Sequence, residues 1–113
     1  MFSSIEITML RKVDTGLPVN LWIDEKINNT SRLMFQNNKS DTFTGKKDLI
    51  AITVDENPEI PLRKYNLKIT SEEFNVVRKF ISLNKTIILK YMNDTTFGLR
   101  DFFSNMQSTS KMS

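Results

Sequence analysis

Carboxylates gather at two places in the sequence where oxygen ligands for a metal ion would be useful. Asp24 and Glu25 follow one predicted strand, and Asp55, Glu56 and Glu59 follow another. Such clusters are typical of Mg²⁺ sites beside a substrate phosphate, and carboxylate pairs also serve as the acid and base of glycosidases. Neither cluster has a recognised ligand spacing, and strands commonly end in charged residues. We therefore expect no metal, no cofactor and no catalytic site.

The chain has no histidine and no cysteine among its 113 residues. Histidine titrates near neutral pH, and cysteine is the strongest ready-made nucleophile among the side chains. Their absence excludes Ser-His-Asp and Cys-His catalysis, the usual zinc sites, iron–sulfur clusters and disulfides. The sequence therefore favours a protein that binds over one that catalyses.

The segment 37–47, NNKSDTFTGKK, has the composition of a recognition loop. Lysines neutralise phosphates, and an aromatic ring stacks on bases. The residues that would do so here are Lys39, Lys46, Lys47 and Phe43. Gly45 and Lys46 form only a fragment of a phosphate-binding loop, because the earlier glycine and the following Ser or Thr are missing. A plain solvated loop is the alternative, since neighbouring aspartates offset part of the charge.

A second group of basic residues lies on the exposed side of a predicted helix. These residues are Arg78, Lys79, Lys85 and Lys90. Acidic residues at the start of the helix and basic residues later suit the helix dipole. Such a face is able to follow a nucleic-acid backbone, although a solvated helix surface has the same composition.

Two further side chains are candidates for an interface. Trp22 is the only tryptophan, and it points away from the aliphatic residues of its predicted strand, so it either covers the second face of the sheet or stays partly exposed as an interface residue. Asn84 falls in the apolar half of the predicted helix, where an amide without partners costs about 1–3 kcal/mol. We expect it to bond to a strand carbonyl or the following helix, or to pair at a dimer interface.

The first half of the chain has strand patterns. Alternating apolar residues predict strands over 5–10, 19–23 and 32–36, and an apolar run predicts one over 49–54. Turn residues over 14–18 favour a hairpin between the first two strands. The segment 49–54 is apolar on both faces, which predicts a central strand covered on both sides. Pro58 and Pro61 follow this segment and mark the end of the strand, because a proline has no N–H to donate to a sheet ladder.

The second half has helix patterns. Thr70 to Glu73 fits a capping box, and from Phe74 to Met92 the apolar residues fill half of a helical circumference. An arc this wide needs cover from the later segment or from a second subunit. Asp94 is expected to cap a shorter helix over 95–106. The apolar face of that helix comprises Leu99, Phe102, Phe103 and Met106.

The composition is that of one globular domain. The sequence is 39% apolar and 26% charged, and it has only three Gly and three Pro. We expect the domain to span 1–106, with 107–113 as a frayed tail. No signal-peptide pattern or membrane span is evident, and the lack of cysteine suits a reducing compartment, so we expect a cytoplasmic protein. The net charge of +3 serves solubility or nucleic-acid binding.

Three short sequence segments and the capped helix follow one another in an order that carries a resemblance. RLMFQN begins at Arg32, DLIAI at Asp48 and NPEI at Asn57, and the capped helix follows. Together, over about residues 20–93, they resemble a type of small bacterial protein to which no activity is assigned. The resemblance implies a bacterial or mobile-element origin and no particular site residue.

These observations predict an α+β fold with a small, mainly antiparallel sheet of about four strands. One long helix in the C-terminal half and a shorter terminal helix pack on it; a mixed sheet is the alternative, if 49–54 pairs in parallel. For function we favour a non-catalytic interaction protein that binds a protein partner or forms a homodimer, through Trp22, Phe43 and the 37–47 loop. The alternative is nucleic-acid binding through the basic loop 39–47 and the basic helix face 78–90. A metal-dependent nuclease that uses the carboxylate clusters is the third hypothesis.

Overall fold

The structure is a computed structural model that describes residues 7–24, 32–62, 64–94 and 96–108. The strands are β1 (Ile7–Leu10), β2 (Leu21–Asp24), β3 (Arg32–Gln36) and β4 (Leu49–Thr53). They form one sheet in the order β1-β2-β3-β4, and every neighbouring pair is antiparallel. The predicted α+β class is confirmed, and the mixed-sheet alternative is wrong because β4 runs antiparallel to β3. Residues 5 and 6 of the first predicted strand lie outside the described residues.

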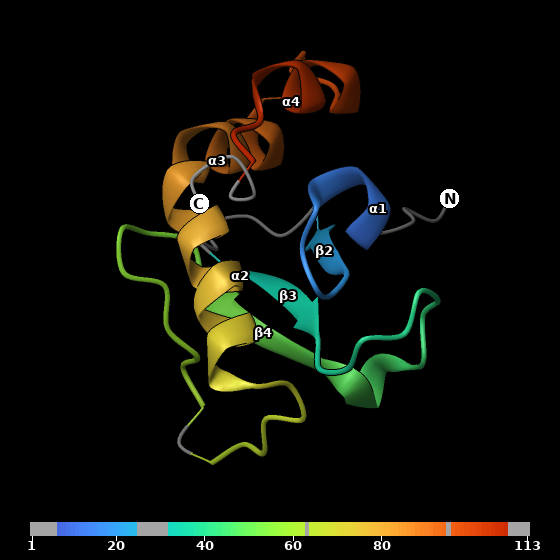
Figure 1. Cartoon of the computed structure of the whole chain (residues 1–113). Helices are drawn as coiled ribbons and strands as arrows, with labels where there is room; N and C mark the ends of the chain where they lie inside the picture. The colour runs from blue at the N-terminus through green and yellow to red at the C-terminus, as the bar shows by residue number, and fades with distance from the viewer. Residues whose placement is uncertain (1–6, 25–31, 63, 95, 109–113) are drawn as a thin grey trace, which may run out of the picture.

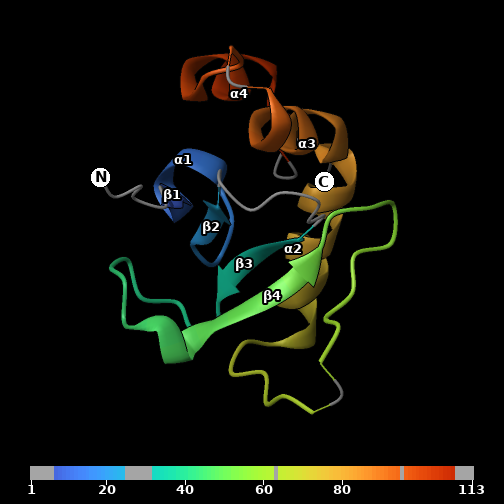
Figure 2. The same ribbon diagram turned by 180° about the vertical axis from the view of Figure 1, so that it is seen from behind.

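Helix α2 (Ser71–Leu83) covers one face of this sheet. The other helices are α1 (Lys12–Thr15), α3 (Lys85–Asn93) and α4 (Leu99–Asn105), and a short 3-10 turn, η1 (Lys46–Asp48), precedes β4. Figure 1 shows α2 lying across the sheet, with α3 and α4 beyond its C-terminal end. In the reverse view of Figure 2, the other face of the sheet carries none of the described helices.

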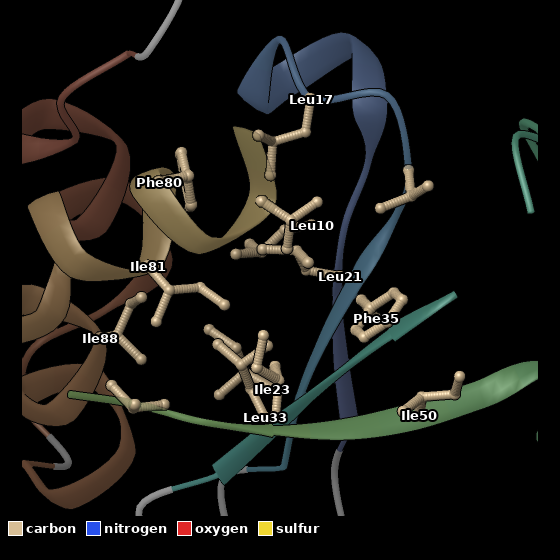
Figure 3. Packing of buried hydrophobic residues seen from close by; sticks show 14 of the residues in the cluster. Leu10, Leu17, Leu21, Ile23, Leu33, Phe35, Ile50, Phe80, Ile81 and Ile88 are labelled. Carbon is tan, nitrogen blue, oxygen red and sulfur yellow. The ribbon is translucent and has the colours of Figure 1, made fainter. Parts of the chain in front are cut away.

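The core lies between the sheet and α2. Strand alternation sends the aliphatic residues of each strand toward the helix, where they meet the apolar side of α2 and α3 (Figure 3). The fully buried members include Leu10, Leu21, Ile23, Phe35, Ile52, Phe80, Ile81 and Ile88. Each such side chain contributes about 1.5–3 kcal/mol when removed from water. This contact therefore sets which face of the sheet is turned inward.

The connection between β1 and β2 is a helical turn. The predicted hairpin is confirmed, since β1 and β2 pair antiparallel, with Leu10 opposite Leu21. The segment predicted as a simple turn contains α1, which ends at Gly16 with φ 79°. A left-handed backbone at this position favours glycine, because any Cβ would be strained there.

Strand β4 is an edge strand, so the predicted central position is wrong. It pairs only with β3 among the described strands, and its alternate residues Leu49, Ala51 and Thr53 are half-buried. The Thr53 N–H donates to the Glu59 carbonyl (2.9 Å), and this contact closes one end of the open edge. The apolar outer side of β4 misled the prediction, because it belongs to an open sheet surface rather than to a second buried layer.

The predicted single helix over 74–92 is two helices, α2 and α3, which meet at Asn84. The capping box at the start of α2 is confirmed: the Glu73 N–H donates to Thr70 Oγ1 (3.0 Å), and the Thr70 N–H donates to Glu73 Oε1 (2.9 Å). At the other end Asn84 has φ −106° and ψ 14°, which interrupts the helix. The apolar spacing has the same period on both sides, so the pattern alone does not reveal the break.

Asn84 is bonded to the segment that follows α4. Its Nδ2 donates to the carbonyls of Phe80 (2.9 Å) and Gln107 (2.9 Å), and its Oδ1 accepts from the Gln107 N–H (2.7 Å). The side chain is buried, at 2% exposure. Its amide is therefore satisfied within one chain, and the dimer-pairing interpretation has no support from this geometry.

The later segment covers the wide apolar arc. Helix α4 packs on α3 through Phe102, whose ring lies 6.0 Å from that of Tyr91. The predicted start of this helix is wrong: Asp94 Oδ1 accepts from Thr96 in a local turn, and α4 begins at Leu99 with Gly98 as its N-cap. The predicted tail begins at Gln107, which Asn84 holds, and residues 109–113 lie outside the described part of the chain.

Replacing Asn84 with Ala should lower the free energy of unfolding by about 1–3 kcal/mol, because the backbone N–H and carbonyl of Gln107 lose their partner. Asn84→Asp keeps the acceptor for the Gln107 N–H and removes both donors, so it should also be destabilised. Urea denaturation measures both. Asn75→Ala, an exposed position on α2, is the matched control and should change stability by less than about 0.5 kcal/mol. An Asn84→Ala change as small as the control would contradict this assignment.

Candidate interaction surface

An apolar row crosses all four strands on the face of the sheet opposite α2. Alternation turns Met9, Trp22, Met34 and Ala51 to this face, and the strand register sets each opposite the next. Cross-strand neighbours on one face lie about 4.5–5.5 Å apart, so these side chains form one continuous surface. All four are half-buried. We call them the outer row.

Phe43 extends the outer row from the loop between β3 and β4. Its ring meets that of Trp22 edge-on, with the ring centres 4.9 Å apart and 64° between the planes, and the side chain is 47% exposed. Trp22 Nε1 is buried and makes no hydrogen bond to any residue in the described part of the chain. The Trp22 ring thus lies on the second face of the sheet and stays partly exposed, and its role at an interface stays a prediction.

Two buried amides hold the loop 37–48 over the end of the sheet. Asn20 Nδ2 donates to the Ser40 carbonyl (3.2 Å), and Gln36 Nε2 donates to the Thr42 carbonyl (3.0 Å). Both amide side chains are 0% exposed, although strand alternation places them on the outer face. The loop that carries Phe43 is thus bonded to the sheet beneath it.

A third amide, Asn37, holds the connection between β4 and α2. Its Oδ1 accepts from the Lys68 N–H (2.8 Å), and its Nδ2 donates to the Asn66 carbonyl (2.7 Å). The Asn37 side chain thus makes the same pair of backbone hydrogen bonds, one donated and one accepted, that a residue of a neighbouring strand would make. Our sequence interpretation missed Asn37, Asn20 and Gln36. One signal was available in the sequence. These strand ends lie beside long polar segments and carry amides, which both donate and accept hydrogen bonds, whereas charged residues are usual at strand ends.

The lysines of the loop differ in their surroundings. Lys39 Nζ lies 3.1 Å from Glu73 Oε2, an ion pair between the loop and the start of α2. Lys46 and Lys47 lie in η1, are exposed, and form no ion pair with another described residue. Two of the three predicted phosphate contacts therefore remain open to a ligand.

Most basic residues of the helix face are occupied within the chain. Their partners are the Pro58 carbonyl for Arg78 Nε (2.9 Å), Glu56 for Lys85 Nζ (3.5 Å) and the Phe97 ring for Lys90 Nζ (5.2 Å). Lys79 is exposed and forms no ion pair in the described ranges. Only Lys85 is paired with an opposite charge, so the contacts of Arg78 and Lys90 fix their orientation without removing their charge.

The basic loop and the basic helix face do not form one patch. Lys46 and Lys47 immediately precede β4, whereas Lys79 lines a surface hollow with Glu56 and Asn57, which follow β4. The length of the strand separates the two groups. A single nucleic-acid strand contacting both would have to cross the edge of the sheet.

The carboxylate clusters do not form a metal site in the described part of the chain. Asp55, Glu56 and Glu59 line a hollow of about 490 Å³ with Lys85, whose ammonium group opposes the binding of a cation. The side chain of Asp24 and the whole of Glu25 lie outside the described residues.

The capping-box carboxylate should make stability depend on pH. The backbone N–H of Thr70, with a smaller contribution from Lys39, holds the pKa of Glu73 below its usual value of 4.5. A lowered pKa in the folded state means that this stabilisation is complete above pH 4.5 and is lost as the pH falls through the folded-state value. Glu73→Gln should therefore be less stable than the wild type near pH 7, and the difference should shrink toward pH 3.

Thermal denaturation across this pH range measures the difference, with Glu72→Gln on the same turn as the control. A gap between Glu73→Gln and the wild type that is equal at both ends of the range would contradict the assignment.

None of the described helices has both the length and the apolar character that a membrane span requires. Comparison of the chain with protein-family models, with curated proteins and with solved structures gives no match. The resemblance to small bacterial proteins stays a prediction.

Proposed function

We propose that this chain is a non-catalytic binding protein of the cytoplasm that recognises a protein partner, or a second copy of itself, through the outer row and Phe43. The observation that carries the proposal is the continuity of the row across Met9, Trp22, Met34 and Ala51. The row is partly exposed and Phe43 beside it is 47% exposed, and contiguous apolar surface of this kind marks interaction sites, in which tryptophan is prominent among the residues that dominate binding energy. The cytoplasmic location is supported by the absence of cysteine.

The bonding of the loop supports the same proposal. Asn20 and Gln36 fix the loop backbone on both sides of Asp41, and the Lys12 ammonium lies 3.0 Å from the Asp41 carboxylate. A loop already ordered in the free protein loses less conformational entropy when it binds. Phe43 is therefore presented to a partner in a fixed position beside Trp22.

Nucleic-acid binding is the second candidate, and one observation favours it. Lys46 and Lys47 are exposed and follow Phe43 in the same loop, so phosphate contacts and base stacking are available side by side. Against it, Lys39 and three of the four basic residues on the helix face already have partners within the chain. This candidate therefore depends on one short stretch of loop.

The test compares three forms of the immobilised chain. The wild type and Val13→Ser, at a 78% exposed position on α1, should bind the same partner. Phe43→Ser should lose at least about tenfold in affinity, because the exposed half of the aromatic pair is gone. Sedimentation of the free chain detects a second copy as the partner. Trp22 is the only tryptophan, so its fluorescence emission should shift when the partner binds.

Equal binding by all three forms would contradict the proposal. Salt-dependent binding to oligonucleotides that is lost in the double variant Lys46→Glu, Lys47→Glu would replace the proposal with the nucleic-acid alternative.

A further inference from the structure

Strand β4, at the margin of the sheet (Figure 2), keeps a short stretch of backbone without a partner. The alternation of an antiparallel ladder points the backbone groups of every second residue away from β3, and in β4 these residues are Leu49, Ala51 and Thr53. The Leu49 N–H donates to the Lys46 carbonyl, and the Thr53 N–H donates to the Glu59 carbonyl (2.9 Å). Both backbone groups of Ala51 and the carbonyl of Leu49 make no hydrogen bond to another described residue. The open part of the edge therefore offers one donor and two acceptors.

A proline keeps the chain from covering this stretch with its own next segment. The segment that bonds to Thr53 runs antiparallel to β4, and continued pairing would set Pro61 opposite Ala51. Proline has no N–H to donate, so the ladder ends after Thr53. Strand β4 itself contains no charged residue, no proline and no bulge, which are devices that keep an edge from pairing. The edge is thus able to receive a strand from outside the chain.

The start of this edge is basic. Lys46 and Lys47 lie in η1, directly before β4, and both are exposed without an ion pair to another described residue. Asp48 follows them, and its carboxylate accepts a hydrogen bond from Thr44 Oγ1 (2.6 Å). Positive charge is therefore in excess where the strand begins.

The other end of the edge is acidic. Asp55, Glu56 and Glu59 follow β4 and are exposed. Lys85 pairs with Glu56 (3.5 Å), whereas Asp55 and Glu59 form no ion pair within the described part of the chain. Negative charge is therefore in excess where the strand ends. A strand that fits this edge in the antiparallel direction must itself begin with basic residues and end with acidic ones, and β4 is such a strand.

We propose that β4 pairs with β4 of a second copy of this chain, antiparallel and about a two-fold axis at Ile50. In this register Ala51 faces Leu49 of the second copy, so each free Ala51 N–H donates to a free Leu49 carbonyl. Lys47 then lies opposite Thr53 of the second copy, where Glu59 is bonded to the edge, and the two-fold axis repeats this ion pair. Parallel pairing would bring the like charges together.

This contact joins the two sheets into one and sets the two outer rows end to end. It adds strand to strand, as in the recognition of extended peptides by a sheet edge. Phe43 takes no part in it, so the inference is independent of the function proposed above.

The test is sedimentation of the whole chain at low salt. Because the open edge is short, the dimer should be weak, and the concentration series should reach about 1 mM protein. A dimer should form as the concentration rises and should weaken with added salt. Hydrogen exchange at the Ala51 N–H should slow over the same concentration range, because only the dimer gives this group an acceptor.

Exchanged charges test the register. Lys47→Glu and Glu59→Lys should each weaken the dimer about tenfold, because like charges then meet at both ends. Glu59→Lys leaves the backbone bonds to Thr53 in place. An equal mixture of the two variants should associate about as well as the wild type, since each changed end then faces an opposite charge. Arg100→Glu, the same kind of charge change at an exposed position on α4, is the matched control and should associate as the wild type does.

Ala51→Pro tests the backbone contact. It removes the outward N–H without removing a bond to β3, so the sheet should form and the dimer should be lost. Phe43→Ser should leave the dimer unchanged.

Four results would overturn the proposal. They are a monomer at every concentration, equal association of Lys47→Glu and the wild type, no recovery when the two charge variants are mixed, and loss of the dimer in Phe43→Ser, which would move the contact to the outer row.

Discussion

Buried side-chain amides hold the irregular parts of this chain in place. Asn20, Gln36, Asn37 and Asn84 are all at most 6% exposed, and each bonds to backbone groups outside the regular helices and strands. A buried amide that lost its partners would cost about 1–3 kcal/mol, so the segments opposite these side chains are constrained to remain there. An amide suits this role because it donates and accepts at once, as Asn20, Asn37 and Asn84 do. Gln36 only donates, and its buried Oε1 has no hydrogen-bond partner among the described residues.

The interaction surface follows from that constraint. The core between the sheet and α2 decides which residues of the strands face outward, and the outer row results from alternation alone. Phe43 joins the row only because the loop folds back over the sheet. There Asn20, just before β2, and Gln36, on β3, donate hydrogen bonds to the loop backbone. Asn84 separates α2 from α3, and its side chain also accepts a hydrogen bond from the Gln107 N–H after α4. This contact holds α4 where it covers α3.

Features governed by neighbouring residues were predictable, and features governed by distant ones were not. The capping box at Thr70 and the alternating strands depend on local spacing, and the structure has them as expected. The edge position of β4 depends on strand order, which its apolar pattern does not encode. Likewise the helix break at Asn84 depends on Gln107, and the orientation of Arg78 depends on Pro58, and both partners are distant in sequence.

The most direct test is hydrogen exchange at three backbone N–H groups outside the sheet ladders. Those of Lys12, Lys68 and Gln107 donate to the side-chain oxygens of Asn20, Asn37 and Asn84, at 2.9, 2.8 and 2.7 Å. If these amides hold the irregular segments, the three protons should exchange at least about a hundredfold more slowly than the N–H of exposed Lys47, which corresponds to an opening free energy of about 3 kcal/mol. Exchange as fast as that of Lys47 would show that the segments open freely, and would contradict the account.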